Sequence, residues 1–124
     1  MTNTQRTLKE LRKRSFISEV VEKFIKTGTI GFRRDLFKII DIISLDFEKG
    51  VMGVQSCGQD FKAHKDKILY EETENTYNWL RTPCTSLELW GWRKIKAKWG
   101  GKKMIWSVRI EEITFEDILK VMTR

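Results

Sequence analysis

The most constraining feature of this 124-residue chain is a pair of apolar segments joined by a short turn. Segment 36–45 (LFKIIDIISL) is a nearly continuous apolar run of strand length, and segment 51–57 (VMGVQSC) follows it after the turn residues FEKG. A turn that ends in glycine between two such runs predicts a β-hairpin. Since both strands are mostly apolar, we expect a sheet that is covered on both faces by helices.

The sequence before this hairpin predicts one helix and one segment whose secondary structure is ambiguous. Residues 4–14 (TQRTLKELRKR) fit a short polar helix, with Leu8 and Leu11 spaced for contact with a core. Residues 16–25 (FISEVVEKFI) fit either a helix or a β-strand, because their apolar, β-branched and aromatic residues suit both. Residues 27–31 (TGTIG) have the composition of a loop.

After the hairpin we expect a helix, two strands and a final helix. The first helix is predicted over 59–80 and ends before Thr82-Pro83, since the residue before proline is pushed out of the helical conformation. Segments 87–96 and 104–110 read as strands around a Gly-Gly turn. Alternation along 87–96 predicts that Leu87 and Leu89 face one side of the sheet and Trp90 and Trp92 the other. A Thr114/Asp117 capping box starts the last short helix. The prediction is one mixed α/β domain over residues 1–124.

The charge and composition of the chain indicate which kinds of binding partner and which cellular location to expect. The chain has 24 Lys and Arg residues against 17 Asp and Glu, a net charge of +7, which suits nucleic acid, although a lysine-rich soluble surface is the alternative. No apolar run approaches the ~20 residues that cross a bilayer, and residues 1–14 are polar and basic, so we expect no membrane partner and no signal peptide. Two cysteines cannot form a disulfide framework. We expect a reducing, cytoplasmic location, or the host cytoplasm for a phage protein.

Segment 90–106 (WGWRKIKAKWGGKKMIW) holds four of the five tryptophans and a series of basic side chains. It fits a basic β-hairpin that lies along DNA, with aromatic rings for stacking or wedging. Alternatively, the tryptophans anchor the core and the lysines keep an edge strand soluble. We expect both, with part of the tryptophans buried and the turn at 100–103 exposed. The predicted DNA contacts here are Arg93, Lys94, Lys96, Lys98, Lys102 and Lys103.

Polar residues interrupt the two apolar strands at positions that can face one another. Asp41 lies within the first strand, and Gln55 and Cys57 share one face of the second. A carboxylate among apolar residues costs free energy unless it is paired or binds a metal. The side-chain oxygen of Gln55 and the backbone carbonyl of Ser56 would add hard oxygen ligands of the kind that Mg²⁺ prefers.

This arrangement resembles the PD-(D/E)XK nuclease superfamily, including the archaeal Holliday-junction resolvases. The resemblance rests on an acidic residue in one strand, a hairpin, and an acidic-or-Gln-X-Lys series in the next strand. Between residues 22 and 113 the ordered motifs RRDLFxxxDIISLD, GVQSCG, HxxKI and LELWGWRK are similar to small phage and bacterial members. The resemblance implies a restriction-endonuclease-like αβββαβ core, with a mixed central sheet flanked by helices, followed here by a C-terminal β-hairpin and short helix. It favours a strand for 16–25.

The resemblance also assigns roles by position. It implies that Asp41 is the motif aspartate and Gln55 the second acidic position, with Mg²⁺ or Mn²⁺ held by these side chains and the Ser56 carbonyl. Glu22, on the neighbouring strand, and Asp35, in the loop before the first strand, could complete the acidic cluster.

Cys57 stands where the superfamily usually has lysine. A cation from the following helix would then take its place, either Lys67 or, less favoured, His64 or Lys65. His64 and Lys67 share one helical face at i, i+3. Arg33, Arg34 and Lys65 join the predicted DNA contacts.

Each candidate also has a structural interpretation. Asp41 could be satisfied by backbone N–H groups or Arg34, and Gln55 by ordinary hydrogen bonds. Cys57 could be a small buried apolar residue. A packed histidine, a solvated lysine and surface ion pairs are the corresponding alternatives for His64, Lys67, Glu22 and Asp35.

The implied activity is that of a Mg²⁺-dependent endodeoxyribonuclease that hydrolyses phosphodiester bonds. Branched or junction DNA as substrate and a homodimeric state follow by analogy with the resolvases. A non-catalytic nucleic-acid-binding module on a degenerate nuclease fold is the main alternative, motivated by Gln55 and Cys57. A protein-interaction subunit that uses the tryptophan-rich hairpin is a third.

Overall fold

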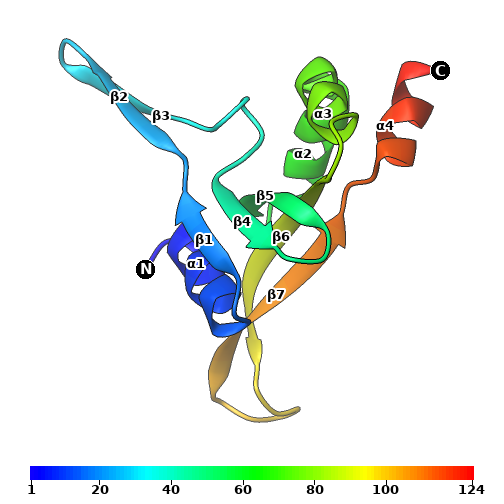
Figure 1. Cartoon of the computed structure of the whole chain (residues 1–124). Coiled ribbons are helices and arrows are strands. Elements are labelled where there is room, and N and C mark those ends of the chain that lie inside the picture. The colour runs from blue at the N-terminus through cyan, green and yellow to red at the C-terminus, as the bar shows by residue number, and fades with distance from the viewer.

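The computed structural model describes the backbone of residues 1–124 and every side chain except that of residue 32 (Figure 1). The helices and strands follow one another as α1 (Asn3–Lys13), β1 (Ile17–Val20), β2 (Lys23–Thr27), β3 (Ile30–Arg34), β4 (Ile42–Asp46), β5 (Gly50–Cys57), α2 (Phe61–Asp66), the π-helical turn η1 (Lys67–Glu71), α3 (Thr73–Leu80), β6 (Thr85–Lys96), β7 (Met104–Glu112) and α4 (Phe115–Met122).

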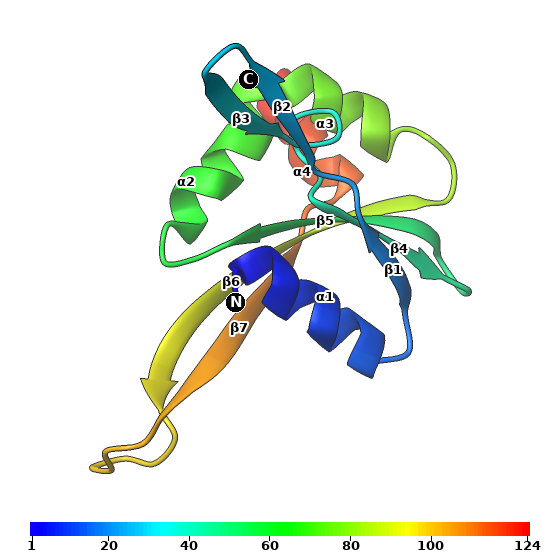
Figure 2. The same cartoon turned by 90° about the vertical axis from the view of Figure 1, so that its left-hand side faces the viewer.

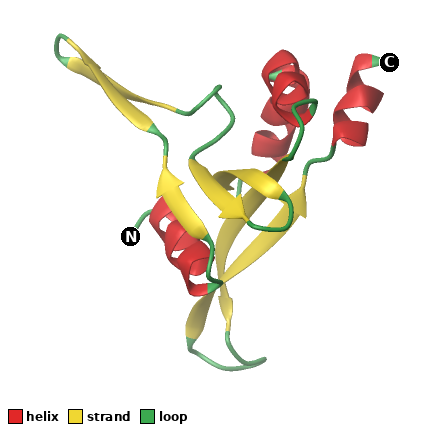
Figure 3. Ribbon diagram, viewed as in Figure 1, coloured by secondary structure: helices red, strands yellow, loops and turns green.

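A mixed five-stranded sheet in the order β1-β4-β5-β6-β7 forms the centre of the fold. Strands β5 and β6 are parallel, and the three other neighbouring pairs are antiparallel. The parallel step requires a crossover, which α2, η1 and α3 provide. Two hairpins project from this body at opposite ends, β2–β3 and the outer part of β6–β7 (Figure 3).

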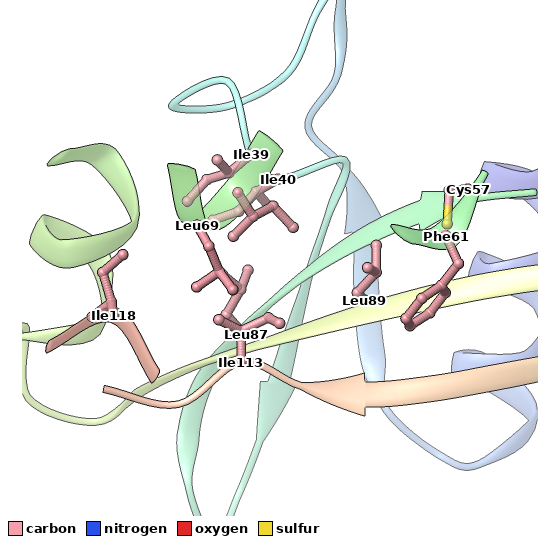
Figure 4. Packing of buried hydrophobic residues seen from close by; sticks show 10 residues of the cluster. Ile39, Ile40, Cys57, Phe61, Leu69, Leu87, Leu89, Ile113 and Ile118 are labelled. Atoms are coloured by element: carbon pink, nitrogen blue, oxygen red, sulfur yellow. The ribbon is translucent and has the colours of Figure 1, made fainter. Parts of the chain in front are cut away.

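Helices cover both faces of the sheet, as the paired apolar strands predict (Figure 2). On one face α1 packs through Leu11 against Ile42, Met52 and Val54. On the other face, a second cluster joins the sheet to α2, η1 and α4, and Figure 4 shows most of its members. The period-2 alternation predicted for β6 is confirmed, because Leu87 and Leu89 belong to this second cluster whereas Trp90 and Trp92 belong to the first.

The predicted capping box at the start of the last helix is confirmed, and the first helix lies within one residue of its predicted bounds. In α4 the Asp117 N–H donates to Thr114 Oγ1, and the Thr114 N–H donates to the Asp117 carboxylate. A capping box of Thr2 and Gln5 starts α1 in the same way. None of the described helices combines the length and the apolar character that crossing a bilayer requires.

The prediction of one strand over 36–45 is wrong in its first half. Phe37 and Lys38 adopt positive φ angles of 53° and 64°, and residues 36–40 form a turn closed by hydrogen bonds between the backbones of Leu36 and Ile40. The strand begins only at Ile42. The apolar character of the segment reflects burial of Ile39 and Ile40 in the core rather than pairing in the sheet.

Segment 16–25 is extended, as the resemblance favours, but it divides between β1 and β2. Residues 27–31, predicted as a loop, include the β2–β3 turn and the start of β3.

The predicted helix 59–80 is interrupted. It passes through the π-helical turn η1 and changes direction at Glu72, whose backbone leaves the helical region at φ −105°, ψ 35°. Thr73 and Thr76 donate their hydroxyl groups to the carbonyl oxygens of Leu69 and Ile68. These hydroxyls satisfy carbonyl groups at the break, which an unbroken helix would pair with backbone N–H groups.

Candidate metal centre

Asp41 lies at the junction of three strands, immediately before β4. Its backbone N–H donates to the Val54 carbonyl of β5 at 2.9 Å, and its carbonyl accepts the Val21 N–H at the end of β1 at 2.9 Å. Its carboxylate Oδ2 accepts the Ser56 backbone N–H at 2.8 Å. Asp41 is only 4% exposed, and these hydrogen bonds to the backbone hold it in place at the end of the sheet.

Two further carboxylates converge on Asp41. Glu22 follows β1 and Asp35 follows β3, so both lie at the root of the inserted β2–β3 hairpin. One carboxylate oxygen from each of Glu22, Asp35 and Asp41 lies within 4.8 Å of the others. The structure therefore brings together the three acidic residues that the sequence suggested for one cluster. Arg33 forms an ion pair with Glu22 at 2.9 Å and partly balances this charge.

The crowding changes the acidity of Asp41. The pKa of Asp41 is raised from 3.8 to about 8, and burial is the largest cause. A hydrogen bond with Asp35 and the negative charges of Asp35 and Glu22 contribute to this rise, while the hydrogen bond from the Ser56 N–H acts in the opposite direction. At neutral pH and without a cation, this raised pKa favours a proton on Asp41 among the three carboxylates.

The chemistry of these donors fits a metal ion, because a divalent cation could replace that proton among the three carboxylates. Such hard oxygen donors are those that Mg²⁺ and similar ions prefer. The N–H and the C=O of one strand residue point to the same edge of the strand. Because the Ser56 N–H donates to the Asp41 carboxylate, the Ser56 carbonyl also points to the edge of β5 that faces the carboxylate cluster.

Gln55 is buried and both ends of its amide are engaged. Its Nε2 donates to the Ile39 carbonyl at 3.1 Å, so its Oε1 is the atom that accepts from His64 Nδ1 at 3.0 Å. The oxygen predicted as a metal ligand is therefore hydrogen-bonded to His64. This contact links β5 to α2 beside the carboxylate cluster.

His64 is hydrogen-bonded through both of its ring nitrogens. Its Nδ1 must donate, because its partner is the oxygen of Gln55. Its Nε2 lies 2.9 Å from Oδ2 of Asp60, a carboxylate that accepts hydrogen bonds. Partial burial alone would raise the pKa of Asp60, but the charge of His64 and hydrogen bonds from His64 and Gly58 outweigh it and lower the pKa. A ring protonated on both nitrogens would satisfy the two acceptors at once.

The other cations predicted for this site lie differently. Lys65 forms an ion pair with Glu111 of β7 at 3.0 Å. Lys67 begins η1, and its amine forms no ion pair with any of the side chains that the structure describes. Of the three alternatives, His64 is the one hydrogen-bonded to Gln55.

Cys57 has the environment of a structural residue. Burial is the largest cause that raises the pKa of its thiol to about 12, and the negative charges of Asp60 and Asp41 add to the effect. A thiol that stays protonated at neutral pH is a poor nucleophile. The interpretation of Cys57 as a small buried apolar residue therefore agrees with its surroundings.

Open hollows border the carboxylate cluster on two sides. Glu22 and Arg33 line one of them, together with the start of α1. Asp35 lines the other, together with Arg34, Lys23 and Lys38. Lys23, Lys38 and Asp60 were not among the candidates from the sequence. Adjacency to Glu22 was the available signal for Lys23, whereas Lys38 reaches this hollow because of the unforeseen turn at 36–40.

The predicted basic hairpin forms, and the tryptophans divide as expected. Trp90 and Trp92 are buried, whereas Trp99 at the turn is 99% exposed. The six basic residues predicted there as DNA contacts are all exposed.

Comparison with protein-family models gives no match for this chain, and comparisons with curated proteins and with solved structures give none either.

Proposed function

We propose that this protein is a metal-dependent DNA endonuclease of the PD-(D/E)XK type. The observation that carries the proposal is the convergence of the Glu22, Asp35 and Asp41 carboxylates at the start of β4, beside the backbone of Ser56. Three carboxylates this close, one of them buried and two half-buried, repel one another unless a proton or a cation lies among them. Metal-dependent nucleases require such a cluster of hard oxygen donors.

The connectivity supports the same proposal. When the inserted β2–β3 hairpin is set aside, the elements α1, β1, β4, β5, α2 and β6 follow the order αβββαβ of the restriction-endonuclease-like core. The first three of these strands form an antiparallel meander, and the fourth is parallel to the third. In this proposal Asp41, directly before the second strand, and Gln55, on the third, would take the motif positions. A shared fold alone does not determine function, so the acidic cluster remains the main argument.

The side chains around the cluster have separate tasks in this proposal. A bound divalent ion would polarise the phosphate and lower the pKa of a coordinated water molecule. Glu22, Asp35 and Asp41 would hold that ion, with the Ser56 carbonyl directed to the same place. His64, fixed by Gln55 and Asp60, would supply the positive charge that lysine supplies elsewhere in the superfamily.

The hollows beside the cluster suit an approaching DNA strand. Arg33 lies on one side, and Lys23, Arg34 and Lys38 lie on the other. Positive side chains around an acidic centre allow phosphate groups to approach the carboxylates despite their like charge. Branched DNA as the preferred substrate and a homodimeric enzyme remain part of the proposal.

One observation favours a second candidate, a nucleic-acid-binding module without catalysis. The motif lysine is replaced by Cys57, whose burial keeps the thiol protonated, and the oxygen of Gln55 is engaged by His64. Such a protein would bind DNA in a salt-dependent manner and take up neither Mg²⁺ nor Mn²⁺ in a calorimetric titration.

The decisive experiment incubates the purified chain with supercoiled plasmid, a flapped duplex and a four-way junction, in the presence of Mg²⁺ or Mn²⁺. We expect cleavage of at least one substrate, and a loss of about 100-fold or more in Asp41→Asn, because several kcal/mol of transition-state stabilisation depend on the ion. Asp46→Asn is the matched control, since Asp46 lies at the far end of β4 from Asp41 and accepts the N–H groups of Glu48 and Lys49 in the following turn. Absence of cleavage of all three substrates with both metals would refute the enzymatic proposal.

A further inference from the structure

The outer part of the β6–β7 hairpin extends beyond the sheet. Strand β5 ends at Cys57, opposite Gly91, so residues 92–96 of β6 pair only with residues 104–108 of β7. These five pairs extend over roughly 17 Å, and the turn adds further length. We refer to residues 92–109 as the basic arm, and Figures 1 and 2 show it projecting from the body.

The basic arm accounts for the net charge of the protein. It holds seven of the 24 Lys and Arg residues and no acidic residue, so the rest of the chain has 17 basic and 17 acidic residues. Arg109, at its root, lies 3.8 Å from Glu111. The six others form no ion pair with any described side chain: Arg93, Lys94, Lys96, Lys98, Lys102 and Lys103.

Two tryptophans fix the root of the arm to α1. The Trp92 indole N–H donates to Thr7 Oγ1 at 2.8 Å inside the protein. The guanidinium of Arg6 lies 3.5 Å from the centre of the Trp106 ring, and the Lys94 amine lies 5.3 Å from it. These contacts stabilise a two-stranded ribbon that would be only marginally stable by itself.

Trp99, at the tip, has no comparable role in the fold. Its side chain is 99% exposed, in a turn closed by hydrogen bonds from Gly101 N–H to the Lys98 carbonyl and from Ala97 N–H to the Lys103 carbonyl. A fully exposed indole forgoes the burial that makes tryptophan stabilising. Its surroundings are positively charged, since Lys98, Lys102 and Lys103 belong to the same turn region.

We propose that the basic arm binds DNA that contains unpaired bases, with its lysines on the phosphates and the Trp99 ring stacked on an unpaired base. A flat aromatic ring on a cationic surface is the usual means of holding unstacked bases, and it works without sequence preference. In intact duplex DNA the base faces are already stacked on one another, so Trp99 gains nothing there while the lysines still contact phosphate. The inference rests on the proposed function only in that DNA is taken as the ligand.

A nucleic acid fits the arm better than a protein partner. The apolar side chains of the arm are interleaved with unpaired lysines, so an apolar partner surface would bury these charges without compensation. A second copy that paired arm to arm would bring like charges together. Phosphates, by contrast, neutralise the lysines and release counterions.

Binding is measured by fluorescence anisotropy of labelled single-stranded, gapped and fully paired DNA in EDTA, which prevents metal-dependent cleavage. We expect Trp99→Ala to weaken binding of single-stranded and gapped DNA by about 10-fold, with little change on the full duplex, and Trp99→Phe to retain most of the affinity. Phe47→Ala is the matched control, because Phe47 is an 82% exposed aromatic residue at the other hairpin turn of the sheet, β4–β5. Replacing Lys102 and Lys103 by Gln should reduce the slope of log K against log salt by about 1.4 on single strands.

Several outcomes would overturn the inference. They are an unchanged affinity in Trp99→Ala, an equal loss on all three DNAs, and no DNA binding by the original chain. Loss of self-association in Trp99→Ala, seen by sedimentation velocity, would assign the tip to a second copy instead. The two proposals can fail separately: structure-selective binding without any cleavage refutes only the nuclease, and cleavage with an unaffected Trp99→Ala refutes only the role of the tip.

Discussion

Asp41 holds a buried carboxyl group that titrates near neutral pH, so the stability of the metal-free protein must follow its ionisation. The pKa of Asp41 is raised from 3.8 to about 8 by burial, then by the hydrogen bond and charge of Asp35. Between these two values the folded chain carries a proton that the unfolded chain lacks. The free energy of unfolding therefore falls as the pH rises through this window, by up to ~1.4 kcal/mol per pH unit.

Asp41→Asn removes this dependence while keeping an oxygen that can accept the Ser56 N–H. From about pH 5.5 to about pH 7.0 the variant should gain ~2 kcal/mol in unfolding free energy relative to the original chain. All other ionisable groups are common to both proteins. The change with pH in the stability difference between the variant and the original chain therefore reports on Asp41.

The assay is urea denaturation in EDTA, followed by tryptophan fluorescence at the two pH values. A stability difference between variant and original chain that is the same at both pH values would refute this account of the cluster. A saturating divalent ion should then stabilise the original chain near pH 8, by about 2.7 kcal/mol at one hundred times its Kd, and leave Asp41→Asn unchanged.

Two further predictions concern neighbouring groups. His64→Ala should lower the unfolding free energy by about 1–3 kcal/mol, because the buried Oε1 of Gln55 loses its hydrogen-bond partner, and urea denaturation measures this directly; a loss close to zero would contradict the described contact. With a thiol-reactive dye near neutral pH, the folded chain should react rapidly at the exposed Cys84 alone. Cys57 should react only in denaturant, because its thiol is buried and its pKa is raised to about 12. Two fast-reacting thiols in the folded protein would be inconsistent with that burial.

Much of the fold could be predicted because it depends on local signals. Alternation in residues 87–96 identifies the two faces of β6, and the Thr114/Asp117 pair identifies the start of α4. Both signals are carried by residues close together in the chain. The turn at 36–40 has no such signal, because Phe37 and Lys38 are not residue types that favour positive φ.

The candidate site could be predicted in part for the same reason. Asp41 stands out as a charge in an apolar run, and the resemblance added Glu22 and Asp35 as neighbours. The contact between His64 and Gln55 could not be derived, since it depends on how α2 lies across the sheet. The sequence favoured Lys67 as the replacement cation because helix spacing does not reveal which side chain reaches β5.

The position of the β2–β3 hairpin has a consequence for how this protein can vary. Glu22 and Asp35 are 13 positions apart in the chain, yet their carboxylates meet, because one precedes the hairpin and the other follows it. An antiparallel hairpin returns the chain to the point where the hairpin begins, whatever the number of paired residues in its two strands. Insertions or deletions at the tip of this hairpin would thus lengthen or shorten an appendage and leave the spacing of the acidic groups intact.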